Sequence, residues 1–429
     1  LVYLLIFLMC TISYGDRAAL SVAVTQMNVD FHLTPIEDGW LLSSYLWTYV
    51  ICLVPMALAV DHWGSRRVSM VSVAFWSVVT AMTAGVWSFG SLIVTRLFLG
   101  LGEAPCFPAG HRAIREWAPA RERGFASTVF TSGILAGVAF GSLASGWLVT
   151  TVGWRYCFLV FGGVGLAWVV AWILWFRDPA QAKWLGKAER EHILATREFE
   201  ETRTHAQGKA SIRVLLSSAS MWGLIITQVC GNYTNVFFLT WLPSYLSRAH
   251  HISILNSGLD TALCYGIACV GTILLGVLSD KILVRFGQPR AGRRYIVAFL
   301  LLGSVVMAFA PYTNSHVVLF ALLTIALTCM QSSLANNQAL TSDLLGDGQA
   351  IGTAIGLLFV FANIVAIVAP VLTGFLVAWT GNFIAAFEAA ASLTVIGALA
   401  ALVLARRPIQ TRRSPEEIRT QPSMPRPAA

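Results

Sequence analysis

The chain carries one apolar segment after another along almost its whole length. A membrane-spanning helix needs about 20 predominantly apolar residues. Windows of that length predict twelve spans, at about 2–24, 39–60, 68–87, 89–110, 124–150, 154–176, 219–246, 256–279, 294–312, 316–341, 350–378 and 382–405. Only 12% of the 429 residues are charged, against about 25% in soluble proteins. The sequence therefore predicts a polytopic, all-α membrane protein.

One long polar segment, 177–218, divides the spans into two groups of six. We expect an N-terminal six-helix bundle at 1–176, a central loop at 177–218 and a C-terminal six-helix bundle at 219–405. Residues 406–429 are rich in Pro, Arg and Ser and are expected to form a disordered tail. The chain opens inside an apolar segment, so we expect a short initiating end to precede Leu1.

Lysine and arginine gather in the loops on one side of the predicted spans. In chain order that side carries Arg66, Arg67, residues 112–123, the central loop, residues 281–294 and the tail. The other side carries Arg155 and Arg248. Positive residues mark the cytoplasmic side, so both termini are expected to be cytoplasmic in a plasma (bacterial inner) membrane. The formal charge of +8 is thus a topology signal and does not predict a nucleic-acid partner.

Neither metal chemistry nor catalysis is indicated. The eight cysteines lie in or at the ends of apolar segments, without a CxxC pair or a neighbouring histidine cluster. No GxSG serine or HExxH pattern occurs. We expect no cofactor, no metal and no catalytic residue.

Four ionisable residues lie inside the first and fourth predicted spans: Asp16 and Arg17 in the first, Arg96 and Glu103 in the fourth. A charge at mid-bilayer costs roughly 2.5–3.5 kcal/mol on insertion scales. Such residues persist where they face one another, a water-filled cavity or a charged ligand. Two acids that carry protons and two arginines that hold an anion indicate a transporter, and ion pairs that only lock helices together are the alternative.

Helical geometry separates these four groups. Arg96 and Glu103 share a helix face about 10 Å apart along the axis, whereas Asp16 and Arg17 point about 100° apart. The planar guanidinium matches a carboxylate. An arginine also stabilises the charged form of a neighbouring acid. A substrate carboxylate weakens that effect, so the acid takes up a proton more readily, which predicts transport of proton and anion in the same direction.

Two loops carry a recognisable pattern. The residues from Asp61 to Arg67 read DHWGSRR, and 276–281 read GVLSDK. Both resemble the major facilitator signature GxLxD[RK]xGRR, one copy per half, although His62 replaces a basic residue in the first copy. This resemblance implies a twelve-helix fold of two pseudo-symmetric bundles with a site between them. It also implies gating roles for Asp61, Arg66 and Asp280.

Three further stretches resemble the anion:cation symporter branch of that superfamily, which includes galactonate, glucarate and hexuronate carriers. They are YGDR at 14–17, RLFLGLGEAP at 96–105 and FLTWLP at 238–243. The resemblance implies that Arg17 and Arg96 hold a substrate carboxylate, and that Asp16 and Glu103 take part in proton coupling.

Other polar residues inside spans are candidates for contacts with a hydroxylated substrate, since amides and hydroxyls donate to and accept from hydroxyl groups. They are Tyr14, Tyr49, Gln228, Asn232, Asn337 and Asn363. Hydrogen bonds between helices are the alternative role. Glycines at every fourth position, in 133–141 and 352–356, predict close helix contact.

Taken together, these features predict a proton-coupled symporter that imports a small organic anion, a sugar acid, by alternating access. Its expected partners are the anion, protons and the bilayer, and we expect a monomer. An organophosphate/phosphate exchanger is the alternative transporter. The resemblance implies that exchangers of that class use one arginine from each half of the molecule. In this chain the seventh span has no arginine before Arg248 at its end, which counts against this alternative. A non-transporting membrane sensor stays possible, although the sequence shows no appended soluble domain.

Overall fold

The computed structural model describes residues 1–119, 122–181, 185–186, 190–191, 193, 212–286, 292–345 and 351–409. The first six predicted spans correspond to α1 (Val2–Phe31), α2 (Pro35–Met82) with the short η1 (Thr83–Gly85), α3 (Phe89–Glu103), α4 (Cys106–Trp117), α5 (Arg123–Thr151) and α6 (Trp154–Trp175). The short segments η2 (Pro179–Gln181) and α8 (Ile212–Leu216) follow. The last six spans are α9 (Ala219–Ala249), α10 (Ile254–Phe286), α11 (Arg293–Ser304) with η3 (Val305–Tyr312), α12 (His316–Leu345), α13 (Ile351–Thr380) and α14 (Ile384–Val403).

These helices make twelve crossings of the predicted membrane, although helices and crossings do not correspond one to one at three places in the chain. The single helix α2 contains two crossings, which join at Gly64, where φ is 81°. A residue without a Cβ adopts that conformation at little cost. One crossing is divided instead between α3 and α4, and another between α11 and η3. Length and hydropathy alone identify ten candidate spans; the second limb of α2 and the more polar α9 complete the twelve.

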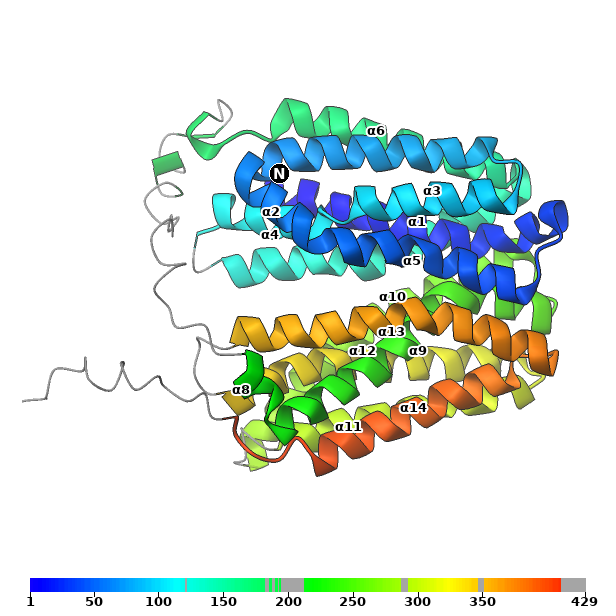
Figure 1. The fold of residues 1–429 in the computed structure, drawn as a ribbon. Coiled ribbons are helices and arrows are strands. Elements are labelled where there is room, and N and C mark those ends of the chain that lie inside the picture. The colour runs from blue at the N-terminus through cyan, green and yellow to red at the C-terminus, as the bar shows by residue number, and fades with distance from the viewer. Residues whose placement is uncertain are drawn as a thin grey trace, which may run out of the picture.

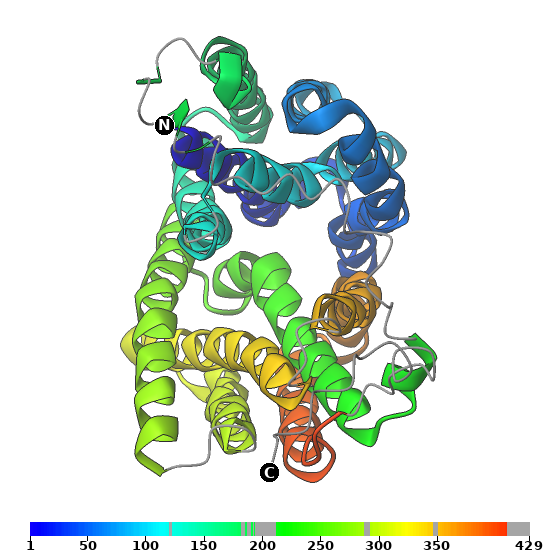
Figure 2. The ribbon, with the colours of Figure 1, turned by 90° about the vertical axis from the view of Figure 1, so that its left-hand side faces the viewer.

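Figure 1 shows the helices running across the view in two groups, α1–α6 above and α9–α14 below. We call the end that carries Leu1, the turn at Gly64 and the start of α11 the basic end. The end that carries the start of α2 and the close of α9 is called the opposite end. Figure 2 looks at the molecule from the basic end, with α5 beside α10 on one side and α2 beside α13 on the other.

Contacts between the two bundles concentrate at the opposite end. Arg248 of α9 forms an ion pair with Asp38 of α2, with Nη2 and Oδ2 separated by 2.7 Å. The hydroxyl of Ser21 in α1 donates to the carbonyl of Thr240 in α9 at 2.8 Å. Among the described residues, the hydrogen bonds and ion pairs of the basic end join residues of the same bundle. The polar contacts that join the two bundles therefore lie toward the opposite end.

Glycines permit the close approach at that end. A Cβ on Gly39 of α2 would lie 2.7 Å from the carbonyl oxygen of Pro370 in α13, and one on Gly374 would lie 2.4 Å from that of Pro35. On the other side of the molecule, a Cβ on Gly258 of α10 would lie 2.6 Å from the carbonyl oxygen of Ser142 in α5. Small residues of this kind let helix backbones meet.

The two predicted glycine rows have different outcomes. In α5, Cβ atoms on Gly133, Gly137 and Gly141 would lie 2.8, 2.5 and 2.6 Å from backbone atoms of α1, which confirms close contact. The prediction for Gly352 and Gly356 is wrong in this structure, because a Cβ on either would meet nothing within 4 Å. Both lie near the basic end of α13.

Candidate functional site

An arginine and a glutamate form a buried pair where α1 meets the end of α3. The Nη2 atom of Arg17 lies 2.6 Å from Oε2 of Glu103, and its Nε donates to the same oxygen at 2.8 Å. The hydroxyl of Ser13 donates to that oxygen at 3.1 Å. The Glu103 side chain is fully buried and that of Arg17 is 7% exposed. Two buried charges thus compensate each other inside the N-terminal bundle.

The position of Glu103 follows from a break in the fourth span. It is the last residue of α3, and Pro105 stands as the N-cap of α4 two positions later. Proline has no backbone N–H and interrupts the helical hydrogen bonds. The break therefore leaves the Glu103 carboxylate at a helix end, opposite α1.

Three tyrosine rings surround the Arg17 guanidinium. Its Cζ lies 4.4 Å from the ring centroid of Tyr14, 5.0 Å from that of Tyr45 and 5.2 Å from that of Tyr49. Aromatic faces attract a cation at such distances and shield it from the surroundings. The donors at the guanidinium edge remain available to an acceptor, and here that acceptor is Glu103.

Asp16 and Arg96 belong to a second buried group. Thr80 donates to Oδ2 of Asp16 at 3.4 Å, and Nη2 of Arg96 donates to the hydroxyl of Thr83 at 2.9 Å. Both ionisable side chains are buried, and the Arg96 guanidinium lies over the ring of Phe158. Within the described residues, Oδ1 of Asp16 and Nε of Arg96 have no hydrogen-bond partner. These atoms form a polar site that is not fully satisfied.

The predicted amides of the C-terminal bundle bond to neighbouring helices or to their own. Nδ2 of Asn337 in α12 donates to Oε1 of Gln228 in α9 at 3.0 Å. Nδ2 of Asn232 donates to the carbonyl of Ala362 at 2.8 Å, and Nδ2 of Asn363 to that of Phe359 at 2.8 Å. In the described part of the chain, no hydrogen bond joins these amides to the Arg17 group. Their predicted role in substrate binding stays a prediction.

Each predicted gating residue bonds within its own bundle. Oδ1 of Asp61 lies 3.7 Å from Nη1 of Arg112. Nη2 of Arg66 donates to the carbonyl of Ile173 at 3.3 Å. Oδ1 of Asp280 lies 3.0 Å from Nη2 of Arg293. The two signature copies therefore make separate networks at the basic end.

Sequence reasoning did not single out three of the residues that complete these groups. Ser13 stands one helical turn before Arg17, so helical spacing could have identified it. Thr80 and Thr83 are ordinary residues at the end of a span, and no pattern in the sequence connects them with Asp16 and Arg96.

Comparison with known proteins places this arrangement in a family. The model of the Major Facilitator Superfamily matches residues 6–350 and 284–427. A probable galactarate/D-glucarate transporter from Escherichia coli is 31% identical over 417 residues, covering 94% of this chain and 92% of that protein. A D-galactonate transporter from Escherichia coli O6:H1 is 30% identical over 417 residues, covering 94% and 95%. A probable sulfoacetate transporter from Cupriavidus necator is 31% identical over 410 residues, covering 96% and 94%.

Solved structures agree on the fold. A bacterial homolog of the human lysosomal transporter Spinster matches with a TM-score of 0.79 at 18% identity, covering 96% of this chain and 98% of that one. A D-xylose-proton symporter matches with a TM-score of 0.73 at 15% identity, with the same coverage. These findings confirm the predicted twelve-helix, two-bundle fold and the prediction of a membrane transporter in place of an enzyme. The chain belongs to the Major Facilitator Superfamily.

Proposed function

We propose that the protein is a proton-coupled symporter that imports a sugar acid by alternating access. One observation carries the proposal: Arg17, held among three tyrosines, has an internal carboxylate at its edge. The guanidinium N–H groups that donate to the carboxylate of Glu103 can equally donate to a carboxylate of the substrate. The two carboxylates then compete for one guanidinium.

This competition links the anion to a proton. When Glu103 is charged, it occupies the edge of Arg17. A proton on Glu103 removes its charge and frees the guanidinium for the carboxylate of the substrate. Proton and anion therefore bind together and cross in the same direction. Asp16, which lies with Arg96 in the second buried group, is the second proton carrier in this proposal, and Arg96 the second anion ligand.

The closed opposite end defines the state of the transporter. Under the positive-inside rule the basic end is cytoplasmic, which puts both termini in the cytoplasm. A molecule closed at the opposite end then faces inward, the state from which an importer releases its substrate. The pair between Arg17 and Glu103 fits this state, since the internal carboxylate has taken the place that the substrate leaves.

The substrate class rests on the relatives and on the amide groups. Relatives named as carriers of galactarate, D-glucarate and D-galactonate cover more than 90% of the chain, and amides in α9, α12 and α13 suit a hydroxylated anion. A phosphate exchanger would need an arginine from the C-terminal bundle. In the seventh span the candidate is Arg248, and it is engaged with Asp38 at the opposite end.

Transport assays in proteoliposomes test the proposal. With a pH gradient, acidic outside, the wild type should accumulate D-galactonate or D-glucarate, and dissipating the gradient should abolish accumulation. Asp16→Asn and Glu103→Gln should lose this accumulation, while at least one of them keeps counterflow exchange, which needs no net proton movement. Arg17→Ala should lose both. Accumulation that follows a phosphate gradient and ignores pH would overturn the proposal.

A further inference from the structure

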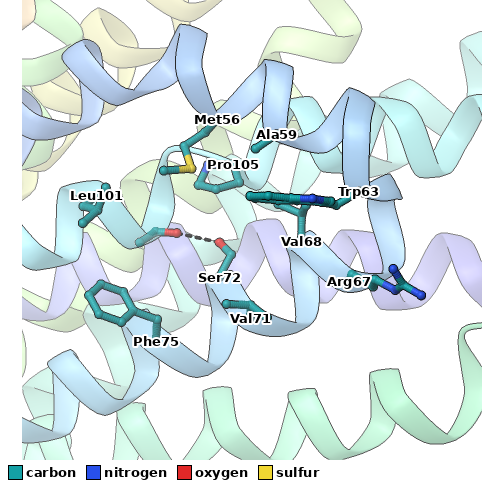
Figure 3. A pocket seen from close by; sticks show the side chains of 11 residues that line it. Met56, Ala59, Trp63, Arg67, Val68, Val71, Ser72, Phe75, Leu101 and Pro105 are labelled. Carbon is teal, nitrogen blue, oxygen red and sulfur yellow. Dashed lines mark hydrogen bonds between the residues drawn. The ribbon is translucent and has the colours of Figure 1, made fainter.

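A cavity of about 410 Å³, which neither Arg17 nor Glu103 lines, lies between the two limbs of α2 and the break between α3 and α4. Met56, Ala59 and Trp63 of the first limb form one wall. Val71 and Phe75 of the second limb form the other, and Pro105 lies at the break. Figure 3 shows these side chains around the opening. The lining is apolar except for Ser72 and Arg67.

The cavity opens at the surface of the protein. At its mouth, Val71 in the third predicted span is 62% exposed, and Trp63, beside the turn between the two limbs of α2, is 60% exposed. In this setting, exposed apolar side chains contact acyl chains. An apolar groove that opens sideways into the bilayer is therefore accessible to lipid.

Its floor is fixed by a close helix contact. The hydroxyl of Ser72 donates to the carbonyl of Gly102 at 2.6 Å, as Figure 3 shows. A Cβ on Gly102 would lie 2.8 Å from Cβ of Trp76, so only glycine lets α3 approach the second limb of α2 this closely. This bond satisfies the Ser72 hydroxyl, and the floor offers a ligand no further strong polar group.

A positive charge marks one end of the groove. In Figure 3 the guanidinium of Arg67 lies at the end away from Phe75 and Leu101. Arg67 is exposed, and within the described residues no hydrogen bond or ion pair engages it. Residues 67 and 75 are separated by about 12 Å of helix rise. The groove thus combines an apolar slot of this length with a free cation at the basic end.

We propose that this groove binds one acyl chain of an anionic phospholipid, with the phosphate of its headgroup on Arg67. Arginine pairs well with phosphate oxygens, and basic residues at a membrane surface attract anionic lipids. The proposal is independent of the transported substrate.

The location of the groove predicts that a bound lipid stabilises the break between α3 and α4. The residue after Gly102 is Glu103, the partner of Arg17. A chain lodged between the α2 limbs and Pro105 supports the break that holds Glu103 in place. Delipidated protein should therefore unfold at a lower temperature, and phosphatidylglycerol should restore its Tm more than phosphatidylcholine does.

Native mass spectrometry tests the proposal with matched variants. Protein equilibrated with equal amounts of phosphatidylglycerol and phosphatidylcholine should retain one tightly held phosphatidylglycerol. Ala59→Trp, which fills the groove, should lose it, whereas Val277→Trp on the exposed face of α10 should keep it. Arg67→Gln should lower the preference for phosphatidylglycerol about tenfold, and Arg285→Gln, an exposed arginine of the other bundle, should leave it unchanged.

Two results would overturn the assignment. Equal lipid retention by the two tryptophan variants would show that the groove holds no lipid, and detergent or a second copy retained in its place would do the same. Equal headgroup preference in the two glutamine variants would remove Arg67 from the site. If Ala59→Trp does not fold, Val71→Trp fills the groove from the opposite wall and is read in the same way.

Discussion

The Arg17 guanidinium is shielded on its faces and engaged at its edge. Cation–π contacts contribute about 0.5–1 kcal/mol each when exposed and about 2 kcal/mol when desolvated. The three tyrosines therefore stabilise the charge whichever carboxylate occupies the edge. Because this support does not depend on Glu103, the exchange of one carboxylate for another leaves Arg17 in a favourable environment.

Neutralising Glu103 should therefore favour the ligand. In Glu103→Gln, Arg17 lacks its charged partner, and removing one member of a buried pair is destabilising. We expect a lower Tm without ligand and a larger rise in Tm with D-galactonate or D-glucarate than in the wild type. Differential scanning fluorimetry measures both. Glu116→Gln, which alters the pair with Arg112, serves as the control and should show the wild-type rise. Weaker binding in Glu103→Gln would mean that Glu103 contacts the ligand and does not compete with it.

Individual residues show which features of the candidate site can be predicted from the sequence. The 100° offset between Asp16 and Arg17 predicts that they face different surroundings, and in the structure they belong to different groups. The polar partners of those groups depend on which helices become neighbours. Thr80 lies 64 residues from Asp16, and local spacing holds no information about such a pair.

At the scale of elements, the opposite end is held by the start of α2 and the close of α9. The side chain of Asp38 is fully buried there, and it accepts from Nδ2 of Asn28 at 3.0 Å in addition to Arg248. The sequence places Arg248 on the less basic side but does not predict its partner, because the contact forms between bundles. The resulting ion pair couples the two halves.

Asp38→Asn should loosen this end. A hydrogen bond to a charged group contributes about 1.5–3 kcal/mol, so protection from hydrogen exchange in 35–43 and 240–248 should fall roughly ten- to 150-fold. The matched control is Asp30→Asn. Asp30 pairs with Arg155 at 3.1 Å, and this pair is more exposed and lies within one bundle, so its loss should change exchange little. Equal exchange in the two variants would show that the Asp38 pair does not hold the bundles together.

At the scale of the whole molecule, α2 and α13 meet in a regular antiparallel register. Gly374 lies against Pro35 and Gly39 against Pro370, and the hydroxyl of Ser43 donates to the carbonyl of Ile367. Each advance of about four residues along α2 matches an equal step back along α13. Continued toward the basic end, this register sets Val54 opposite Gly356 and Leu58 opposite Gly352. Val54 and Leu58 are 67% and 65% exposed.

Alternating access requires the basic end to close when the opposite end opens, and the register predicts where it closes. Gly356→Leu should prevent that closure. We expect counterflow transport to fall at least tenfold, while the ligand still raises the Tm, because the state open at the basic end remains accessible. Gly163→Leu on α6, also at a glycine with nothing within 4 Å, is the control and should transport normally. Normal transport by both variants would exclude this register.

The register predicts a role for Gly352 and Gly356, the two glycines of α13 beside which a Cβ would meet nothing within 4 Å. A glycine inside a helix weakens it by roughly 0.5–1 kcal/mol relative to alanine, and in the present arrangement Gly352 and Gly356 gain no contact in return. The register predicts that Val54 and Leu58 of α2 pack against this bare backbone when the basic end closes. On this prediction, the glycine face of α13 in the present conformation is complementary to the face of α2 that it contacts in the conformation closed at the basic end.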